Sequence, residues 1–230
     1  MATSYRVAEA DMERDSRAIA QIISRVFAGG NYVDEIMREY VGNCNYDPQV
    51  TRLVWDGERL AHHWGVWGYA MCLDQQVTLR VGGIGAVATD EEYRKQGLMD
   101  RAARASFQAM LEQGYDLSIL RGRHYVKYGY ARAWHYVTYR LGASLGAEIP
   151  SDAPPPYRGL RGAEDFAALT ALYNREYAAL CGSAVRPTYR SFKSEGPLPS
   201  YYGWFGADGQ MAGFVRALSS QDAELDSKNG

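Results

Sequence analysis

An apolar strand, a short loop and an amphipathic helix follow one another between residues 77 and 112, and this succession constrains the fold more than any other feature of the chain. The strand 77–88 carries glycines at positions 82, 83 and 85, and glycine in a strand lets another backbone approach closely. The loop has the sequence RKQGLM at residues 94–99, and the helix 98–112 is followed by Gly114, a residue typical of helix C-termini. A strand, a tight loop and a helix N-terminus in this order form a geometry that binds phosphate.

The loop at residues 94–99 has the chemistry of an anion-binding cradle. A helix start presents backbone N–H groups that have no intrahelical partner, at the positive end of the helix dipole. Arg94 and Lys95 add positive charge beside them. An ordinary strand-to-helix turn, in which Gly97 relieves a close contact, explains the loop alone equally well. The context favours the cradle, because a second apolar strand at 116–120 and the aromatic turn YVKYGY at 125–130 follow the helix.

Composition and charge exclude several classes of protein. The chain has 230 residues, a formal net charge of −2 and a pI near 6.1, without a stripe of Lys and Arg, so we expect no nucleic-acid partner. No apolar run has the length of a membrane span, and residues 1–6 lack the apolar core of a secretory signal. We therefore expect a cytoplasmic protein without a membrane partner. The three cysteines are odd in number and widely spaced, which predicts neither a disulfide framework nor a metal site.

Strands and helices are predicted along the rest of the chain from hydrophobic periodicity and end signals. Asp11 opens the first helix and Gly29 closes it, while the Asp56-Gly57 dipeptide predicts a hairpin turn. The expected strands are 5–7, 51–55, 60–72, 77–88, 116–120 and 136–141, and the expected helices are 11–29, 32–41 and 98–112.

The second part of the chain repeats the opening pattern. After a Pro-rich linker at 146–156, a Tyr-Arg pair, a helical segment and an Asp-Gly turn recur at the spacing seen in the first part. The repeat indicates an internal duplication, with chance recurrence of the Asp-Gly pair as the alternative. The second copy stops before any RxxG loop, and a polar tail follows at 219–230. We expect domains at 1–145 and 157–218, joined by the linker.

These features resemble the GNAT superfamily of N-acetyltransferases over roughly residues 50–141. The pairing of RxxGLM at 94–99 with YxxYGY at 125–130 is most similar to the enhanced intracellular survival (Eis) acetyltransferases. The resemblance implies an α/β fold with a mixed, mostly antiparallel central sheet flanked by helices, followed by the start of a second, degenerate GNAT-like unit. Met99 departs from the small residue that the general signature has there, and it leaves less room for a pyrophosphate.

The family resemblance also implies a function. We expect an acetyl-CoA-dependent N-acetyltransferase that acetylates a primary amine of a small molecule or a lysine-type acceptor, with a non-catalytic acyl-CoA-binding module as the alternative. Eis-like enzymes carry a third, sterol-carrier-like domain and supply the general base from the end of their chain. Residues 80–87 contain no carboxylate that replaces this base. The sequence is then either a natural short form or a fragment, and we expect a fragment, with homo-oligomers where the full family architecture is present.

Specific residues are assigned roles on the same basis. Tyr125 occupies the position of the family's general acid, with a half-buried packing tyrosine as the alternative. Acceptor recognition is the least defined part, because Asp34, Glu35 and Glu39 with Trp64 and Trp67 fit either a cleft for a cationic amine or a solvated helix face above core tryptophans. The expected cofactor-binding residues are Val87, Ala88 and Thr89 on the strand for the pantetheine arm, and Arg94, Lys95, Gln96, Gly97, Leu98 and Met99 in the loop for the pyrophosphate.

Overall fold

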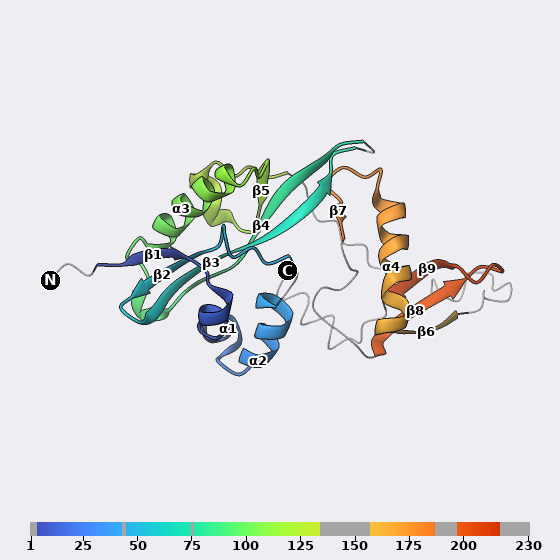
Figure 1. Ribbon diagram of the computed structural model, residues 1–230, viewed down its shortest axis with the longest axis horizontal. Helices are drawn as coiled ribbons and strands as arrows, with labels where there is room; N and C mark the ends of the chain where they lie inside the picture. Colours follow the sequence, from blue (N-terminus) through green and yellow to red (C-terminus); the bar gives the residue numbers. More distant parts are fainter. Residues whose placement is uncertain (1–3, 43–44, 75, 134–156, 187–196, 217–230) are drawn as a thin grey trace, which may run out of the picture. The chain divides into compact units, whose positions relative to one another are not determined.

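The computed structural model describes residues 4–42, 45–74, 76–133, 157–186 and 197–216 (Figure 1). The strand expected at 136–141, the linker 146–156 and the tail 219–230 fall outside these residues. The described residues form two compact units, one within Met1–Arg121 and Arg161–Gly196 and one within Gly122–Leu160 and Pro197–Gly230. The domain boundaries expected from the sequence stay a prediction.

A six-stranded sheet forms the centre of the first unit. Its order is β1-β2-β3-β4-β5, with β7 pairing to β3, and every pairing is antiparallel except that of β4 with β5. The mixed, mostly antiparallel sheet predicted for this chain is therefore confirmed. The strands are β1 (Arg6–Glu9), β2 (Arg52–Asp56), β3 (Arg59–Cys72), β4 (Thr78–Thr89), β5 (Leu117–Ile119) and β7 (Ala184–Val185).

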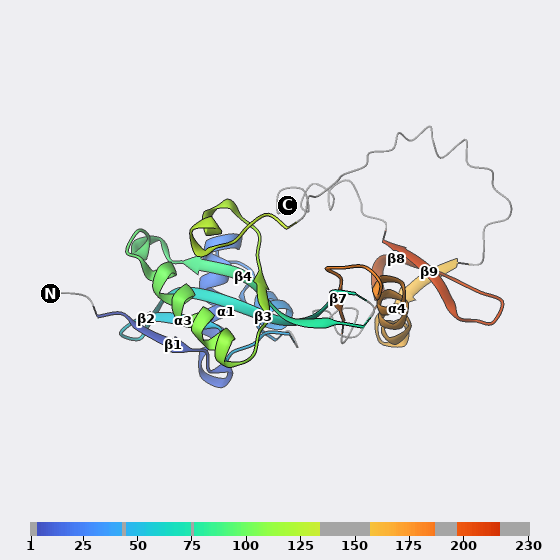
Figure 2. The same ribbon diagram turned by 90° about the horizontal axis from the view of Figure 1, so that it is seen from above.

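Helices cover both faces of this sheet, with α3 on one face and α1 and α2 on the other (Figures 1 and 2). The Asp11 side chain accepts hydrogen bonds from the backbone N–H groups of Glu13 and Arg14, and Gly29 ends α1 with φ 62°, as the sequence predicted. The helices of the first unit are α1 (Met12–Ala28), α2 (Val33–Ile36), α3 (Leu98–Glu112) and α4 (Gly162–Tyr177).

The second expected helix, 32–41, differs in detail from the prediction. It consists of the short α2 followed by a π-helical turn, η1 (Met37–Val41). The turn closes with a hydrogen bond of 2.7 Å from the Gly42 N–H to the Met37 carbonyl, one residue wider than an α-helical bond. Hydrophobic periodicity does not distinguish an α-helical turn from a π-helical turn, because both place apolar residues on the same side of the helix.

Apolar side chains from both helical layers fill the core of the first unit. Ile19, Ile22 and Ile23 of α1 are buried and pack with Leu53 and Trp67 of the sheet. On the other face, Trp64 contacts Phe107 of α3 edge-on, with ring centroids 5.8 Å apart. Leu60 and Trp67 of β3 thus belong to the core on the α1 face, and Trp64 faces α3.

The second unit contains a three-stranded sheet of order β6-β8-β9, from β6 (Tyr157–Arg161), β8 (Pro197–Phe205) and β9 (Met211–Arg216). Antiparallel β8 and β9 flank the Asp208-Gly209 turn, so the hairpin in the predicted repeat is present. The same unit contains a short 3-10 helix, η3 (Arg123–Tyr128). Whether this unit is a degenerate GNAT half stays a prediction. None of the described helices is long and apolar enough to cross a membrane.

Candidate functional site

A β-bulge interrupts β4 near its end. His63 of β3 pairs with Ala88 and Gly65 pairs with Gly85, so β4 has one residue more than β3 in this interval. Ala86 lies in the bulge with φ 46°, a left-handed conformation that is uncommon for a residue with a Cβ atom. The bulge thus re-aims the backbone immediately before the predicted pantetheine-binding segment.

Beyond the bulge, β4 presents a backbone edge that faces away from β3. The Asp90 N–H donates to the Ala61 carbonyl at 3.0 Å, and in an antiparallel ladder the peptide groups alternate between facing the partner and facing away. Val87 and Thr89 therefore direct their backbone N–H and C=O groups outward. On that side β5 pairs only with Val81–Gly83, so within the described residues no strand covers the edge at 87–89.

The loop after β4 leads directly into the N-terminus of α3. A 3-10 turn, η2 (Glu91–Tyr93), is followed by Lys95 with φ 62° and Gly97 with φ 75°. Gly97 precedes the first residue of α3 and provides no side-chain cap, and a Cβ atom built on it meets no atom within 4 Å. The start of the helix is therefore open to a ligand, which is the geometry that the cradle hypothesis requires.

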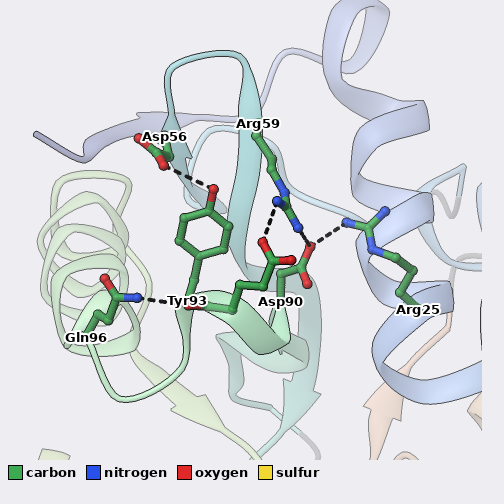
Figure 3. A network of polar contacts seen from close by, with 7 residues as sticks. Arg25, Asp56, Arg59, Asp90, Tyr93 and Gln96 are labelled. Carbon is green, nitrogen blue, oxygen red and sulfur yellow. Dashed lines mark hydrogen bonds and ion pairs between the residues drawn. The ribbon is translucent and has the colours of Figure 1, made fainter. Parts of the chain in front are cut away.

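Two carboxylates and two guanidinium groups brace this loop against α1 and β3 (Figure 3). The Asp90 carboxylate accepts hydrogen bonds from Arg25 at 3.0 Å and Arg59 at 3.2 Å, and Arg59 also binds Glu92 at 2.6 Å. Burial opposes the charge on Asp90, but the two guanidinium groups outweigh it and hold the pKa of the carboxyl below its usual value. Asp90 therefore stays ionised and links two elements to the loop at neutral pH.

The side chains of the loop have distinct surroundings. Gln96 accepts a hydrogen bond from the Tyr5 hydroxyl and donates to the Glu92 carbonyl at 3.0 Å, so it braces the loop (Figure 3). Arg94 forms a long, exposed ion pair of 3.9 Å with Glu91, which competes weakly with a ligand. Lys95 is exposed, Met99 is half-buried, and Leu98 is buried. Leu98 can therefore contribute its backbone, while its side chain anchors α3 in the core.

Sequence reasoning missed two buried histidines behind the bulge. His62 Nδ1 lies 2.7 Å from the Thr89 hydroxyl, and His63 Nδ1 lies 2.8 Å from the Ala86 carbonyl. Both side chains are fully buried. Burial lowers the pKa of His62 to about 3 and that of His63 to about 4, so both are neutral near pH 7. Two adjacent histidines inside an apolar strand could have indicated a buried polar site. Their hydrogen-bond partners, however, depend on the register of β3 and β4.

These histidines make stability depend on pH. In the unfolded chain they take up protons below their ordinary pKa of about 6.5, whereas in the folded chain they do not until pH about 3 to 4. We expect the free energy of unfolding to fall between pH 6.5 and 4.5, by up to about 1.4 kcal/mol per pH unit for each histidine. Urea unfolding at several pH values measures this. The His63→Asn variant should lose about half of the slope. A flat profile across this range contradicts the prediction.

Tyr125 lies in η3 of the second unit. Its ring is half-buried and meets the Tyr130 ring edge-on, with centroids 6.5 Å apart. Burial raises the pKa of the Tyr125 phenol, so the hydroxyl keeps its proton at neutral pH, as a general acid must. The structure thus brings the strand 87–89 and the loop 94–99 together in the first unit, and it places Tyr125 in the second.

The candidate acceptor residues fall into two groups, exposed acidic residues and buried tryptophans. Asp34 is exposed and lies 3.8 Å from Arg17, and Glu35 is also exposed. Trp64 is fully buried, and the buried Trp67 donates its indole N–H to the Tyr40 carbonyl at 3.2 Å. Both tryptophans belong to the core, so the idea that they line an acceptor cleft is wrong. They are buried because their large apolar rings lie on a strand that is covered on both faces.

Comparisons with known proteins agree with this geometry. A family model described as "Acetyltransferase (GNAT) domain" matches residues 6–133. No match was found among curated protein sequences.

Two solved structures share the fold over most of the chain. One is a protein of Enterococcus faecalis named as a probable N-acyltransferase, with 15% identity, a TM-score of 0.65, and coverage of 95% of this chain and 56% of that one. The other is Eis1 from Mycobacterium abscessus, with 15% identity, a TM-score of 0.60, and coverage of 80% and 45%. The chain spans about half the length of each of these structures.

Proposed function

The chain belongs to the GNAT acetyltransferase family, and on this premise we propose that it is an acetyl-CoA-dependent N-acetyltransferase. The proposed acceptor is a primary amine of a small molecule or a lysine-type side chain. One observation carries the proposal most directly. The outward backbone edge of Val87–Thr89 continues into a loop that ends at the open N-terminus of α3.

This arrangement suits the two chemically different parts of coenzyme A. The pantetheine arm contains amides, which can pair with the outward backbone groups of Val87 and Thr89 as an added strand does, whereas the backbone groups of Ala88 face β3. The pyrophosphate carries negative charge, which suits the N–H groups at the start of α3 and the exposed Arg94 and Lys95. Gln96 braces the loop, and Gly97 leaves room for close approach.

The proposed reaction needs one proton donor and one amide dipole. The neutral amine nitrogen attacks the thioester carbonyl, the C–N bond forms and the C–S bond breaks. The nitrogen gives up a proton to water, and the departing thiolate takes a proton. A backbone N–H of β4 polarises the carbonyl, and Tyr125 protonates the thiolate. Burial raises the pKa of Tyr125, so the phenol is protonated before the thiolate leaves, as the second role requires.

We also propose that the chain is an Eis-like enzyme. The shared fold with Eis1 and the motif pairing at 94–99 and 125–130 support Eis-like chemistry. We propose further that the chain acts in the cytoplasm and that residues 157–218 are a degenerate GNAT half without a site of its own. Homo-oligomers are expected where the complete family architecture is present.

A non-catalytic acyl-CoA-binding module is the second candidate. The observation that favours it is that no carboxylate occurs in Thr78–Thr89, so this strand supplies no general base.

Calorimetry with acetyl-CoA, followed by a free-thiol assay, separates the two candidates. Polyamines, aminoglycosides and lysine peptides serve as the amine panel. Binding with amine-dependent thiol release supports the enzyme, whereas binding without release for every amine supports the module. A chain that does not bind acetyl-CoA contradicts both candidates.

A further inference from the structure

The carbonyl of Ala86 is held by a side chain instead of the neighbouring strand. At the bulge the regular pairing of β3 and β4 is interrupted, and His63 Nδ1 lies 2.8 Å from the Ala86 oxygen. A carbonyl oxygen can only accept a hydrogen bond, so Nδ1 carries the hydrogen and donates it. His63 therefore replaces the backbone donor that the bulge removes.

The second ring nitrogen of His63 is fixed as well. In a neutral imidazole that donates from Nδ1, Nε2 is an acceptor, and the Tyr46 hydroxyl lies 3.0 Å from it. The two rings are also nearly parallel, with an interplanar angle of 7° and centroids 6.2 Å apart. Tyr46 thus donates to His63, and His63 donates to Ala86, so the tautomer and the ring orientation are both determined.

The His63 ring occupies space that is free because residue 65 is a glycine. A Cβ atom built on Gly65 comes within 2.5 Å of His63 Cε1 and 2.9 Å of the Gly85 carbonyl oxygen. Any side chain at position 65 would therefore displace the ring or the strand beside it. At the far end of the segment, His62 contacts the Thr89 hydroxyl at 2.7 Å. The backbone between Ala86 and Thr89 is thus held from β3 at both ends, while Val87 and Thr89 face outward.

We propose that His63 is a positioning residue, which fixes the Ala86 bulge and thereby aims the outward backbone groups of Val87–Thr89 at the thioester of acetyl-CoA. This inference rests on the proposed function. His63 itself lies behind the strand and is fully buried, so in this proposal it acts through the strand. Its effect arises because a polarising N–H helps only when it lies within hydrogen-bond distance of the developing oxyanion.

Two variants of the full chain separate the hydrogen bond from the packing. His63→Asn keeps an N–H donor near the position of Nδ1. The double variant Tyr46→Phe/His63→Leu removes the donor together with the hydroxyl that would otherwise be left buried and unpaired. We expect the double variant to lose about 100-fold in kcat, because small misplacements of catalytic groups cost this much. Its Kd for acetyl-CoA should rise by at most about tenfold, since the loop at 94–99 is unchanged and only the pantetheine contacts at Val87 and Thr89 are disturbed.

Ser106→Ala is the matched control. Ser106 of α3 is buried and donates to the Val50 carbonyl at 2.6 Å, so its replacement also removes a buried side-chain bond to a carbonyl, but away from the bulge. Thermal unfolding of all variants verifies that they are folded. The control should lose stability and keep kcat.

The outcomes distinguish this inference from the proposed function. A kcat loss in the double variant that His63→Asn restores to within about threefold of the parent supports the positioning role. Equal kcat in all variants, or an equal loss in His63→Asn and the double variant, overturns it. A parent chain that releases no thiol from acetyl-CoA with any amine overturns the proposed function, and the inference with it.

Discussion

Replacement of Gly97 by valine is expected to weaken acetyl-CoA binding about 100-fold, which corresponds to about 2.7 kcal/mol. Gly97 has φ 75° and faces open space immediately before α3. A β-branched side chain there occupies the volume through which the pyrophosphate must approach the backbone N–H groups. Calorimetric titration with acetyl-CoA measures the change.

Gly114→Val is a control matched in conformation. Gly114 has φ 73°, also faces open space, and follows the other end of α3, about 22 Å away along a helix of 15 residues. Both substitutions place a branched residue in the left-handed region, at a cost of about 1–2 kcal/mol in stability. Only Gly97→Val should also lose affinity. Equal affinity in the two variants would exclude the loop as the pyrophosphate site.

Local chemistry explains which parts of the fold were predictable. The cap at Asp11, the end of α1 at Gly29 and the hairpin at Asp56-Gly57 each depend on a few neighbouring residues, and the sequence predicts all three correctly. The strand, loop and helix around residues 94–99 were predictable for the same reason. Their short-range signals agree with the tertiary structure, so no long-range contact overrides them.

The bulge was not predictable, because it results from long-range pairing. Ala86 adopts a left-handed conformation without being glycine or asparagine, and only the register of β3 against β4 imposes it. The roles of His62 and His63 follow from that register. Trp64 and Trp67 could be assigned to the core only after both faces of β3 were known to be covered.

The catalytic role of Tyr125 was assigned from the sequence alone. Its assignment as general acid came from a motif, and the structure adds that it is half-buried with a raised pKa. Neither observation measures proton transfer, so the role has to be tested by kinetics.

In the Tyr125→Phe variant, kcat is expected to fall about 10²–10⁴-fold while the Kd for acetyl-CoA changes by less than about threefold. Phenylalanine keeps the ring and its edge-on contact with Tyr130 but removes the hydroxyl that is proposed to protonate the thiolate. The loss should be greatest with acceptors for which thiolate departure limits the rate. Steady-state thiol release and calorimetry on the same preparations measure the two quantities.

Tyr128→Phe provides the comparison within the same short helix. Tyr128 also belongs to η3, and its ring lies under the Lys127 ammonium group at 4.9 Å, so removing its hydroxyl tests a tyrosine of similar chemistry without an assigned role. It should retain kcat to within about threefold. If both variants lose activity equally, the segment acts through packing. If neither loses activity, the thiolate takes its proton from another group or from water, and Tyr125 has a structural role in the second unit.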